Sequence, residues 1–280
     1  MVRSGALVVP CPSTARRRRT AGARRGRAGS LAAALAVAVT AALAPISQAS
    51  AATPQRPRSP AARAPAKEVR LSNEWSITTW AYGLSKQVIY ARASIRARRI
   101  GRVRLENQAG FPEIYVLLSE RLESSGADWV QLRVPGRPNG RIGWVRAAAL
   151  GSFEQTHWAI VVSLRARRLS AYLRGRLRFR APVGVGKPST PTPVGHFWVS
   201  ERLAVSNRSS PYWPYVLGTS DYSTLTDWPG GGVVGIHGDF GEPQWIPGDP
   251  SHGCVRMLDP DILWLARHVT LGTPVEIRRG

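Results

Sequence analysis

Between about residue 72 and residue 150, short runs of alternating apolar and polar residues replace any long helical period. Side chains at alternate positions of a strand face the same side, so such runs predict half-buried β-strands. The runs are residues 88–90, 114–118, 129–134 and 141–145. The cluster 135–140, which ends in Asn-Gly, predicts the turn between the last two strands. About eighty residues of short strands predict a small β-barrel over 72–150.

Residues 152–280 also carry mostly strand patterns, together with one helix pattern. The predicted strands are residues 158–163, 168–173, 176–183, 196–199 and 275–277. Residues 184–195 hold three prolines, which exclude the helix start that a phosphate-binding glycine loop needs, so we expect an irregular loop. Asp259 is predicted to cap a helix with Pro260 in its first position, because apolar residues then recur at helical spacing over 262–269. The chain is therefore predicted to be mainly β.

The first 51 residues have the three parts of a secretory signal peptide. An Arg-rich stretch over 1–30 precedes sixteen mostly apolar residues, 31–46, and Ala-Ser-Ala follows at 49–51. The alternative is an uncleaved membrane anchor, but sixteen residues fall short of the ~20 that span a bilayer. We therefore expect export, and no integral membrane span after cleavage of the leader.

Residues 52–71 combine Pro, Ala and Arg without periodicity. Such a segment has too little apolar side-chain surface to bury a core, so it predicts an extended linker. A spacer that holds the folded part away from a membrane or wall and a simple disordered tail both fit this composition.

The strong positive charge narrows the range of partners without naming a function. The whole chain carries a formal charge of +22, and eight of the arginines lie in residues 1–51, which contain no acid. The remaining excess is spread evenly, whereas a nucleic-acid binder concentrates basic residues on one element. We expect loose attraction to an anionic cell-wall polymer and no nucleic acid as partner.

Cysteine usage is more informative than charge. The chain has only Cys11, which lies in the predicted leader, and Cys254. This count excludes a disulfide framework and cysteine-rich zinc sites in the mature chain. A single thiol in an exported protein is a liability unless it is buried or used.

The candidate chemistry lies just before the predicted helix, in Ser251-His252-Gly253-Cys254-Val255-Arg256. A nucleophilic cysteine needs a nearby base, and His252 and His237 lie two and seventeen residues before Cys254. Gly253 leaves the backbone free to turn, so that its N–H groups could converge on an oxyanion.

Three other interpretations of these residues stay open at this point. Cys254 could be a buried small hydrophobic residue, and His237 could be a hydrogen-bonded histidine at a strand end. A zinc hydrolase using His237, Asp239, His252 and Cys254 is a further alternative, although these residues lack a recognised zinc spacing.

The motif pair His237-Gly238 and Ser251-His252-Gly253-Cys254-Val255-Arg256 resembles the signature of the L,D-transpeptidase catalytic domain, the YkuD-type family of bacterial wall enzymes. Residues 184–195 resemble the G-K-x-x-x-x-T-P-x-G loop of the family, and the helix from Asp259 resembles its post-cysteine helix. The resemblance covers about residues 156–278. The thirteen residues between His237 and Ser251 are at the short end of the family range, and Arg256 stands where one branch has Asn.

The resemblance implies a reaction on peptidoglycan stem peptides. Cys254 would attack the carbonyl that precedes the terminal D-Ala of a tetrapeptide stem, and His237 would be the general base. Loss of D-Ala leaves a thioester, which an amine of a second stem resolves into a 3→3 cross-link. Water as acceptor would make the enzyme an L,D-carboxypeptidase. The resemblance implies no metal or other cofactor.

Supporting roles also come from the resemblance. Backbone N–H groups around His252, Gly253 and Cys254 would hold the oxyanion, and His252 would orient the loop or the thiol. Ser251 would hold a ring nitrogen of a catalytic histidine or fix the turn. Arg256 would bind a substrate carboxylate or form an internal salt bridge.

Residues 129–145 resemble bacterial SH3-like modules. This resemblance implies a wall-binding or substrate-positioning role for 72–150, and a structural spacer is the alternative. We therefore expect a monomer with a small SH3-like barrel, followed over 152–280 by a β-rich L,D-transpeptidase domain with a short helix after the cysteine. It would work outside the cytoplasm, associated with the cell wall or periplasmic. A non-catalytic wall-binding protein of the same fold is the remaining alternative.

Overall fold

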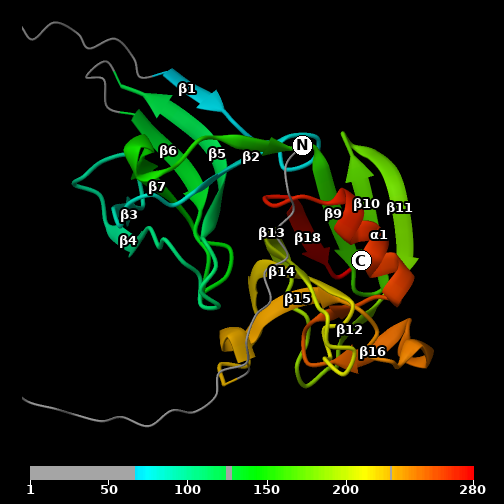
Figure 1. Cartoon of the computed structure of the whole chain (residues 1–280). Coiled ribbons are helices and arrows are strands. Elements are labelled where there is room, and N and C mark those ends of the chain that lie inside the picture. Colours follow the sequence, from blue (N-terminus) through cyan, green and yellow to red (C-terminus); the bar gives the residue numbers. More distant parts are fainter. Residues whose placement is uncertain (1–66, 124–127, 228) are drawn as a thin grey trace, which may run out of the picture. The chain divides into compact units, whose positions relative to one another are not determined.

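The computed structural model describes residues 67–123, 128–227 and 229–280 (Figure 1). The predicted signal peptide, residues 1–51, and most of the predicted linker lie outside the described residues. The end of the linker segment differs from the prediction, because residues 67–70 form an exposed strand that pairs with a neighbour. Within the described part of the chain, no helix is both long and apolar enough to cross a bilayer.

An eight-stranded sheet forms the upstream β module, which we define as residues 67–156. Its strands are β1 (Lys67–Arg70), β2 (Thr78–Tyr82), β3 (Val88–Tyr90), β4 (Arg99–Arg102), β5 (Ile114–Leu122), β6 (Asp128–Arg133), β7 (Ile142–Arg146) and β8 (Glu154–Thr156). The path through the sheet is β4-β3-β7-β6-β5-β2-β8, and β1 pairs with β5. The four strands predicted in this region are present.

The alternation of apolar and polar side chains explains why these segments form a sheet. Val130 and Leu132 of β6 are fully buried, whereas Gln131 between them is only half-buried. The boundary predicted after residue 150 cuts off β8, which lies beyond it but pairs with β2. The short polar strand β8 has no apolar alternation, so no sequence pattern indicates this pairing.

A ten-stranded sheet carries the C-terminal part of the described chain. Its strands are β9 (Trp158–Ser163), β10 (Arg168–Leu173), β11 (Arg176–Pro182), β12 (Gly184–Gly186), β13 (Gly195–Ala204), β14 (Tyr215–Tyr222), β15 (Val233–His237), β16 (Gly248–Ser251), β17 (Val255–Arg256) and β18 (Pro274–Arg278). They follow the order β11-β10-β9-β18-β13-β14-β15-β17-β12-β16. The pairs β9–β18, β15–β17 and β12–β16 are parallel.

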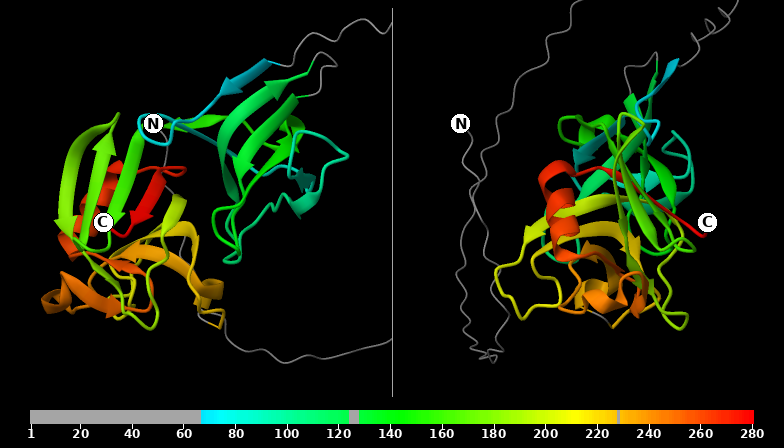
Figure 2. Two further views of the ribbon diagram at one scale, coloured as in Figure 1. Left: turned by 180° about the vertical axis from the view of Figure 1, so that it is seen from behind. Right: turned by 90° about the vertical axis from the view of Figure 1, so that its right-hand side faces the viewer.

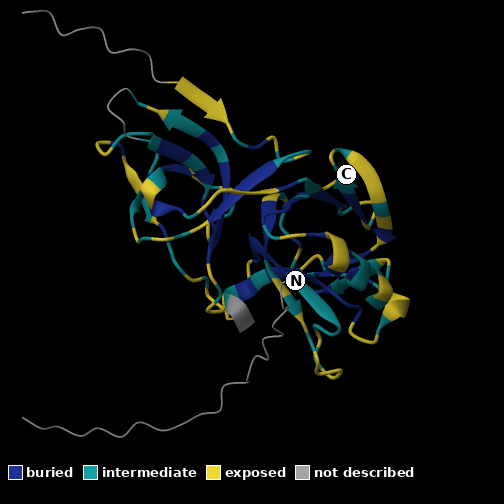
Figure 3. Cartoon of the chain, turned by 45° about the horizontal axis from the view of Figure 1, so that its top comes forward, coloured by how far each residue is buried: buried dark blue, intermediate teal, exposed yellow. Residues whose placement is uncertain are grey.

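The single α-helix of the described residues, α1 (Asp259–His268), packs beside this sheet (Figures 1 and 2). Ile262 and Leu265 are fully buried and join a core with Val255, Met257 and Ile236. The outer strand β11 is mostly exposed, as Figure 3 shows. The predicted mainly-β architecture with a short helix after the cysteine is confirmed.

Two local predictions were wrong in detail. Leu258, not Asp259, is the N-cap of α1, and the Asp259 carboxylate accepts a hydrogen bond from the Asp239 N–H at 3.3 Å. The loop predicted for residues 184–195 begins with strand β12, which pairs with β16 and β17. Its glycines gave no strand signal, because they carry no side chains that could alternate.

Candidate active site

Strand pairing brings Cys254 beside β15. Cys254 directly precedes β17, which runs parallel to β15 with Ile236 opposite Val255 and His237 opposite Arg256. The same register sets Gly235 opposite Cys254, and the Gly235 N–H donates a hydrogen bond to the Cys254 Sγ at 3.4 Å. The sheet therefore fixes the sulfur against the backbone of β15.

The His237 ring lies against the same glycine. His237 ends β15, and a Cβ placed on Gly235 would be 4.0 Å from the His237 Cδ2. The Cys254 sulfur and the His237 ring thus both lie near Gly235. No role is predicted for Gly235 from the sequence, where its only signal is its place two residues before the histidine.

Hydrogen bonding selects one form of the His237 ring. Its Nδ1 lies 2.9 Å from the Gly238 carbonyl oxygen, which can only accept, so Nδ1 carries the proton and Nε2 is the accepting nitrogen. The Tyr212 ring meets the imidazole edge-on at 5.3 Å between centroids. Burial lowers the pKa of His237 to about 4, with the Arg256 charge as a smaller cause in the same direction. The ring is therefore neutral at pH 7 and able to accept a proton.

The Cys254 thiol is also neutral at rest. Burial raises its pKa, the Gly235 hydrogen bond and the Arg256 charge lower it, and the Asp221 carboxyl raises it. Burial is the largest of these effects. The resting pair is then a thiol and an imidazole rather than a thiolate and an imidazolium.

The turn before Cys254 is held from two sides. Ser251 Oγ donates to the Cys254 carbonyl at 2.6 Å and accepts from the Gly253 N–H at 3.1 Å. Of the two roles considered for Ser251, the structure shows the one that fixes the turn. The Gly253 N–H, one of the oxyanion donors expected here, therefore already has a partner.

Thr192, for which the sequence predicts no role, supports the turn from the other side. Its Oγ1 donates to the Gly253 carbonyl at 2.8 Å and accepts from the Gly186 N–H at 2.8 Å. Gly253 itself has φ +125°, a conformation that favours glycine. The Thr-Pro step of the loop resembling the family pattern was the only available signal for this bridge.

Replacing Thr192 with valine is expected to lower both stability and turnover. The change keeps the shape of the side chain but leaves the buried Gly186 N–H and Gly253 carbonyl without their shared partner, a loss of about 1–3 kcal/mol in the free energy of unfolding. Denaturant unfolding measures this loss. Thr190→Val is the matched control, because the Thr190 Oγ1 is buried without a hydrogen-bond partner. An equal loss in both variants would contradict the bridging role.

His252 and Arg256 lie differently around the thiol. His252 is exposed, and its Nε2 lies 3.1 Å from the Lys187 Nζ. Arg256 forms an ion pair with Glu242 at 2.8 Å, and its Nε is buried without a hydrogen-bond partner. Its guanidinium lies 5.5 Å from the centre of the Phe240 ring. Of the two partners expected for Arg256, the structure shows the internal one.

A buried carboxyl group near the thiol could not be foreseen from the sequence. Asp221, in β14, is fully buried, and burial raises its pKa to about 8. Its Oδ1 accepts a hydrogen bond from the Asn139 Nδ2 at 2.6 Å, and its Oδ2 has no partner. Asn139 lies more than eighty positions earlier in the chain, so no local pattern links the two residues.

The residues considered for zinc do not gather as a metal centre. Over residues 67–123, 128–227 and 229–280, no group of three or more His, Cys, Asp and Glu side chains is arranged to hold a metal ion. We assign no residue to a metal or an organic cofactor.

A half-buried thiol, a neutral imidazole whose Nε2 is the accepting nitrogen, and a glycine turn held by hydrogen bonds define a cysteine-dependent acyl-transfer site. Comparison with known proteins agrees: residues 157–277 match the family model of the L,D-transpeptidase catalytic domain. L,D-transpeptidase YkuD of Bacillus licheniformis is 33% identical over 167 residues, which are 56% of this chain and 93% of that protein. The chain belongs to the L,D-transpeptidase family, the cysteine acyltransferases of peptidoglycan.

Other relatives share a smaller part of their length. L,D-transpeptidase YkuD of Bacillus subtilis is 35% identical over 120 residues, which are 43% of this chain and 65% of that protein. The chain spans about half, 49%, of L,D-transpeptidase 1 of Mycobacterium tuberculosis, at 28% identity over 42% of its own length. A crystal structure of Enterococcus faecium L,D-transpeptidase matches 43% of this chain and 48% of that chain with 26% identity and a TM-score of 0.34.

Proposed function

We propose that this enzyme acts on peptidoglycan tetrapeptide stems through a thioester on Cys254, releasing D-Ala and forming 3→3 cross-links. The observation that carries the proposal is the placement of the Cys254 thiol and the His237 ring against the same residue, Gly235. The proposal takes its substrate from the family, whose members act on peptidoglycan.

In the first half-reaction, His237 Nε2 takes the thiol proton while Sγ attacks the carbonyl of the residue before the terminal D-Ala. The oxyanion would be held by the N–H groups of His252 and Cys254. The tetrahedral intermediate collapses by breaking the C–N bond, the imidazolium returns its proton to the leaving amine of D-Ala, and a thioester remains. Because both groups start neutral, proton transfer accompanies attack on the carbonyl.

In the second half-reaction, an amine of another stem attacks the thioester. His237 Nε2 accepts the amine proton, the C–S bond breaks, and the sulfur recovers the proton as a thiol. Attack by water would release a tripeptide instead, which is the L,D-carboxypeptidase alternative. The proposed cross-link requires that the acceptor amine reach the thioester before water does.

Arg256 has two parts to its proposed role. Its charge lowers the pKa of the Cys254 thiol and so favours loss of the proton. Its guanidinium, on a side chain that is 13% exposed and paired with Glu242 at 2.8 Å, is the donor that we propose for a substrate carboxylate. Export by the leader and loose binding to an anionic wall polymer complete the proposed setting.

The composition of the products tests the proposed function. Incubating the full chain with tetrapeptide-bearing muropeptides is expected to give dimers that have lost one D-Ala. In these dimers the third residue of one stem is linked to the third residue of the other. Tandem mass spectrometry of the digest distinguishes three outcomes. Tripeptide monomers alone would identify the carboxypeptidase, and unchanged tetrapeptides would favour the non-catalytic wall-binding protein.

A further inference from the structure

The turn between β6 and β7 reaches the segment that follows β14. Arg137 on this turn donates to three backbone carbonyls there. Its Nη2 bonds Ser223 at 2.7 Å and Leu225 at 3.0 Å, and its Nη1 bonds Gly231 at 2.9 Å. The guanidinium also lies 4.9 Å from the centre of the Tyr222 ring. One side chain of the upstream β module thus fixes both ends of a connection in the catalytic domain.

Asn139 holds the residues just before that connection. Its Nδ2 donates to the Asp221 Oδ1 at 2.6 Å and to the Tyr222 carbonyl at 2.9 Å. Its Oδ1 accepts from the Tyr222 N–H at 3.3 Å. Both ends of the amide therefore bind the last two residues of β14.

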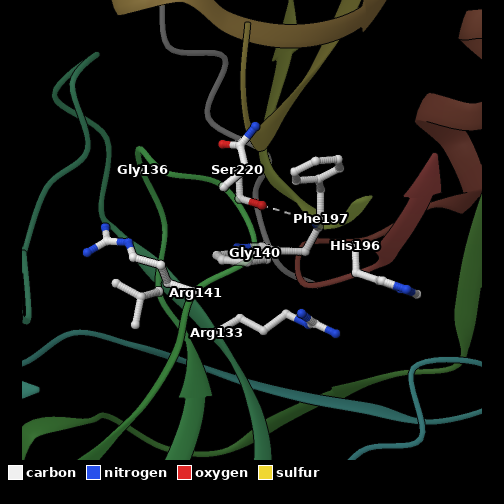
Figure 4. Close-up of a pocket in the computed structure, with 10 residues that line it drawn as sticks. Arg133, Gly136, Gly140, Arg141, His196, Phe197 and Ser220 are labelled. Carbon is white, nitrogen blue, oxygen red and sulfur yellow. Dashed lines mark hydrogen bonds between the residues drawn. The ribbon is translucent and has the colours of Figure 1, made fainter. Parts of the chain in front are cut away.

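On the side of the turn that faces β13, the surfaces around these bonds are closely packed. The space lined by Gly136, Gly140, Phe197 and Ser220 has a volume of about 10 Å³, close to the room that one water needs (Figure 4). Trp80, Ile114 and Val116 of the upstream β module form one buried cluster with Trp198 of β13. On its other side the turn borders an open hollow of about 360 Å³, which Arg137 lines with Arg102 and Gln108. A displacement of the turn toward β13 would therefore be transmitted to the end of β14.

The segment that the β6–β7 turn holds packs next to Gly253, the residue before Cys254. A Cβ placed on Gly253 would be 3.3 Å from the Ser223 Cβ, so Ser223 packs against the turn that presents Cys254. The Asp221 carboxyl is close enough to act on the charge state of the Cys254 thiol. Ser223, which Arg137 holds by a hydrogen bond, therefore borders the catalytic turn, and Asp221, which Asn139 holds, is two residues before Ser223 in the chain.

We propose that Arg137 and Asn139 are positioning residues of the transpeptidase site. They lock residues 221–223 against Gly253 and thereby set where the Cys254 sulfur and its oxyanion donors lie. This inference rests on the proposed function and extends it, because it gives the upstream β module a part in catalysis.

The contrast with Arg141 separates this role from simple support of the turn. Arg141 is on the same turn and also donates to three carbonyls, but all three belong to the upstream β module: Ile100, Pro135 and Pro138. Arg141 therefore stabilises the turn itself. All three carbonyls that accept hydrogen bonds from Arg137 belong to the catalytic domain.

A reciprocal exchange tests the Asn139–Asp221 contact. Asn139→Asp sets a carboxylate against the Tyr222 carbonyl and the Asp221 carboxyl, and we expect kcat for D-Ala release to fall about 10²-fold with KM little changed. Adding Asp221→Asn restores the side-chain hydrogen bond in the opposite direction, so kcat should recover by at least about tenfold. Wild-type kcat in the single variant, or no recovery in the double variant, would overturn the proposal. Melting temperatures of both proteins show whether each is folded.

Hydrogen exchange tests Arg137 without any substrate. Arg137→Lys keeps the charge but cannot span three carbonyls, so amides of residues 251–256 should exchange at least about threefold faster. Arg102→Gln is the control, because Arg102 is exposed on β4 and lines the same open hollow as Arg137. Faster exchange confined to residues 128–146 would mean that Arg137 supports only its own module. If the wild type released no D-Ala, the proposed function would fail, while this experiment would still decide the positioning role.

Discussion

Replacing Cys254 with alanine is expected to lower the rate of D-Ala release from a tetrapeptide stem by at least about 10³-fold, because the variant has no atom that can form the thioester. The role of the thiol is to form the covalent bond to the substrate, and a neighbouring acid or base cannot replace it in that role. The only described interaction it loses is the 3.4 Å hydrogen bond from the Gly235 N–H. Release of D-Ala, followed with a D-amino acid oxidase assay, measures the effect.

The same measurement needs a folded control. Cys254→Ala should melt within a few degrees of the wild type, because a small side chain replaces a small one. Equal D-Ala release by the two proteins would show that another group does the chemistry. A large fall in the melting temperature would instead direct the test to Cys254→Ser, which keeps a polar atom facing Gly235.

His237→Gln is expected to reduce kcat by about 10²–10⁴-fold, the range that a positioned general base contributes. Glutamine can keep a hydrogen bond to the Gly238 carbonyl, but its amide cannot take the thiol proton. Initial rates with saturating stem peptide give kcat. A variant with more than about a tenth of wild-type kcat would contradict the assignment of the base.

The pH dependence of kcat/KM gives an independent check of this base. Burial lowers the pKa of His237 to about 4, so the acidic limb of the wild-type profile should lie near pH 4 and not near 6.5. The free energy of unfolding also falls as the pH is lowered, because His237 binds its proton near pH 6.5 in the unfolded chain and only near pH 4 in the folded chain. The contribution of His237 to stability is therefore present above 6.5 and lost as the pH falls toward 4.

Strong local patterns explain which elements the sequence could predict. Residues 129–134 alternate regularly and form β6, and the apolar spacing over 262–269 forms α1. The pair Cys254 and His237 is predicted from the resemblance of residues 237–238 and 251–256 to a family signature, whereas the residues alone leave other interpretations open. Each of these signals lies within one short stretch of chain.

Features that depend on contacts between distant segments could not be predicted in the same way. The Asn139–Asp221 hydrogen bond joins two sheets, and no pattern near either residue indicates it. Asp221 looks like an ordinary strand polar residue until its surroundings are known. Thr192 is similar, because only the fold sets its hydroxyl between Gly186 and Gly253. Tertiary contacts therefore decide the fine geometry around a site whose chemistry is visible in the sequence.

The most direct test of the central claim is the intact mass of the enzyme during turnover. Wild-type protein quenched in acid while it processes a tetrapeptide stem should gain the mass of the tripeptide acyl group, and peptide mapping should locate that group on Cys254. The Cys254→Ala protein should gain nothing. An acyl group on any other residue, or the same gain in both proteins, would contradict the account.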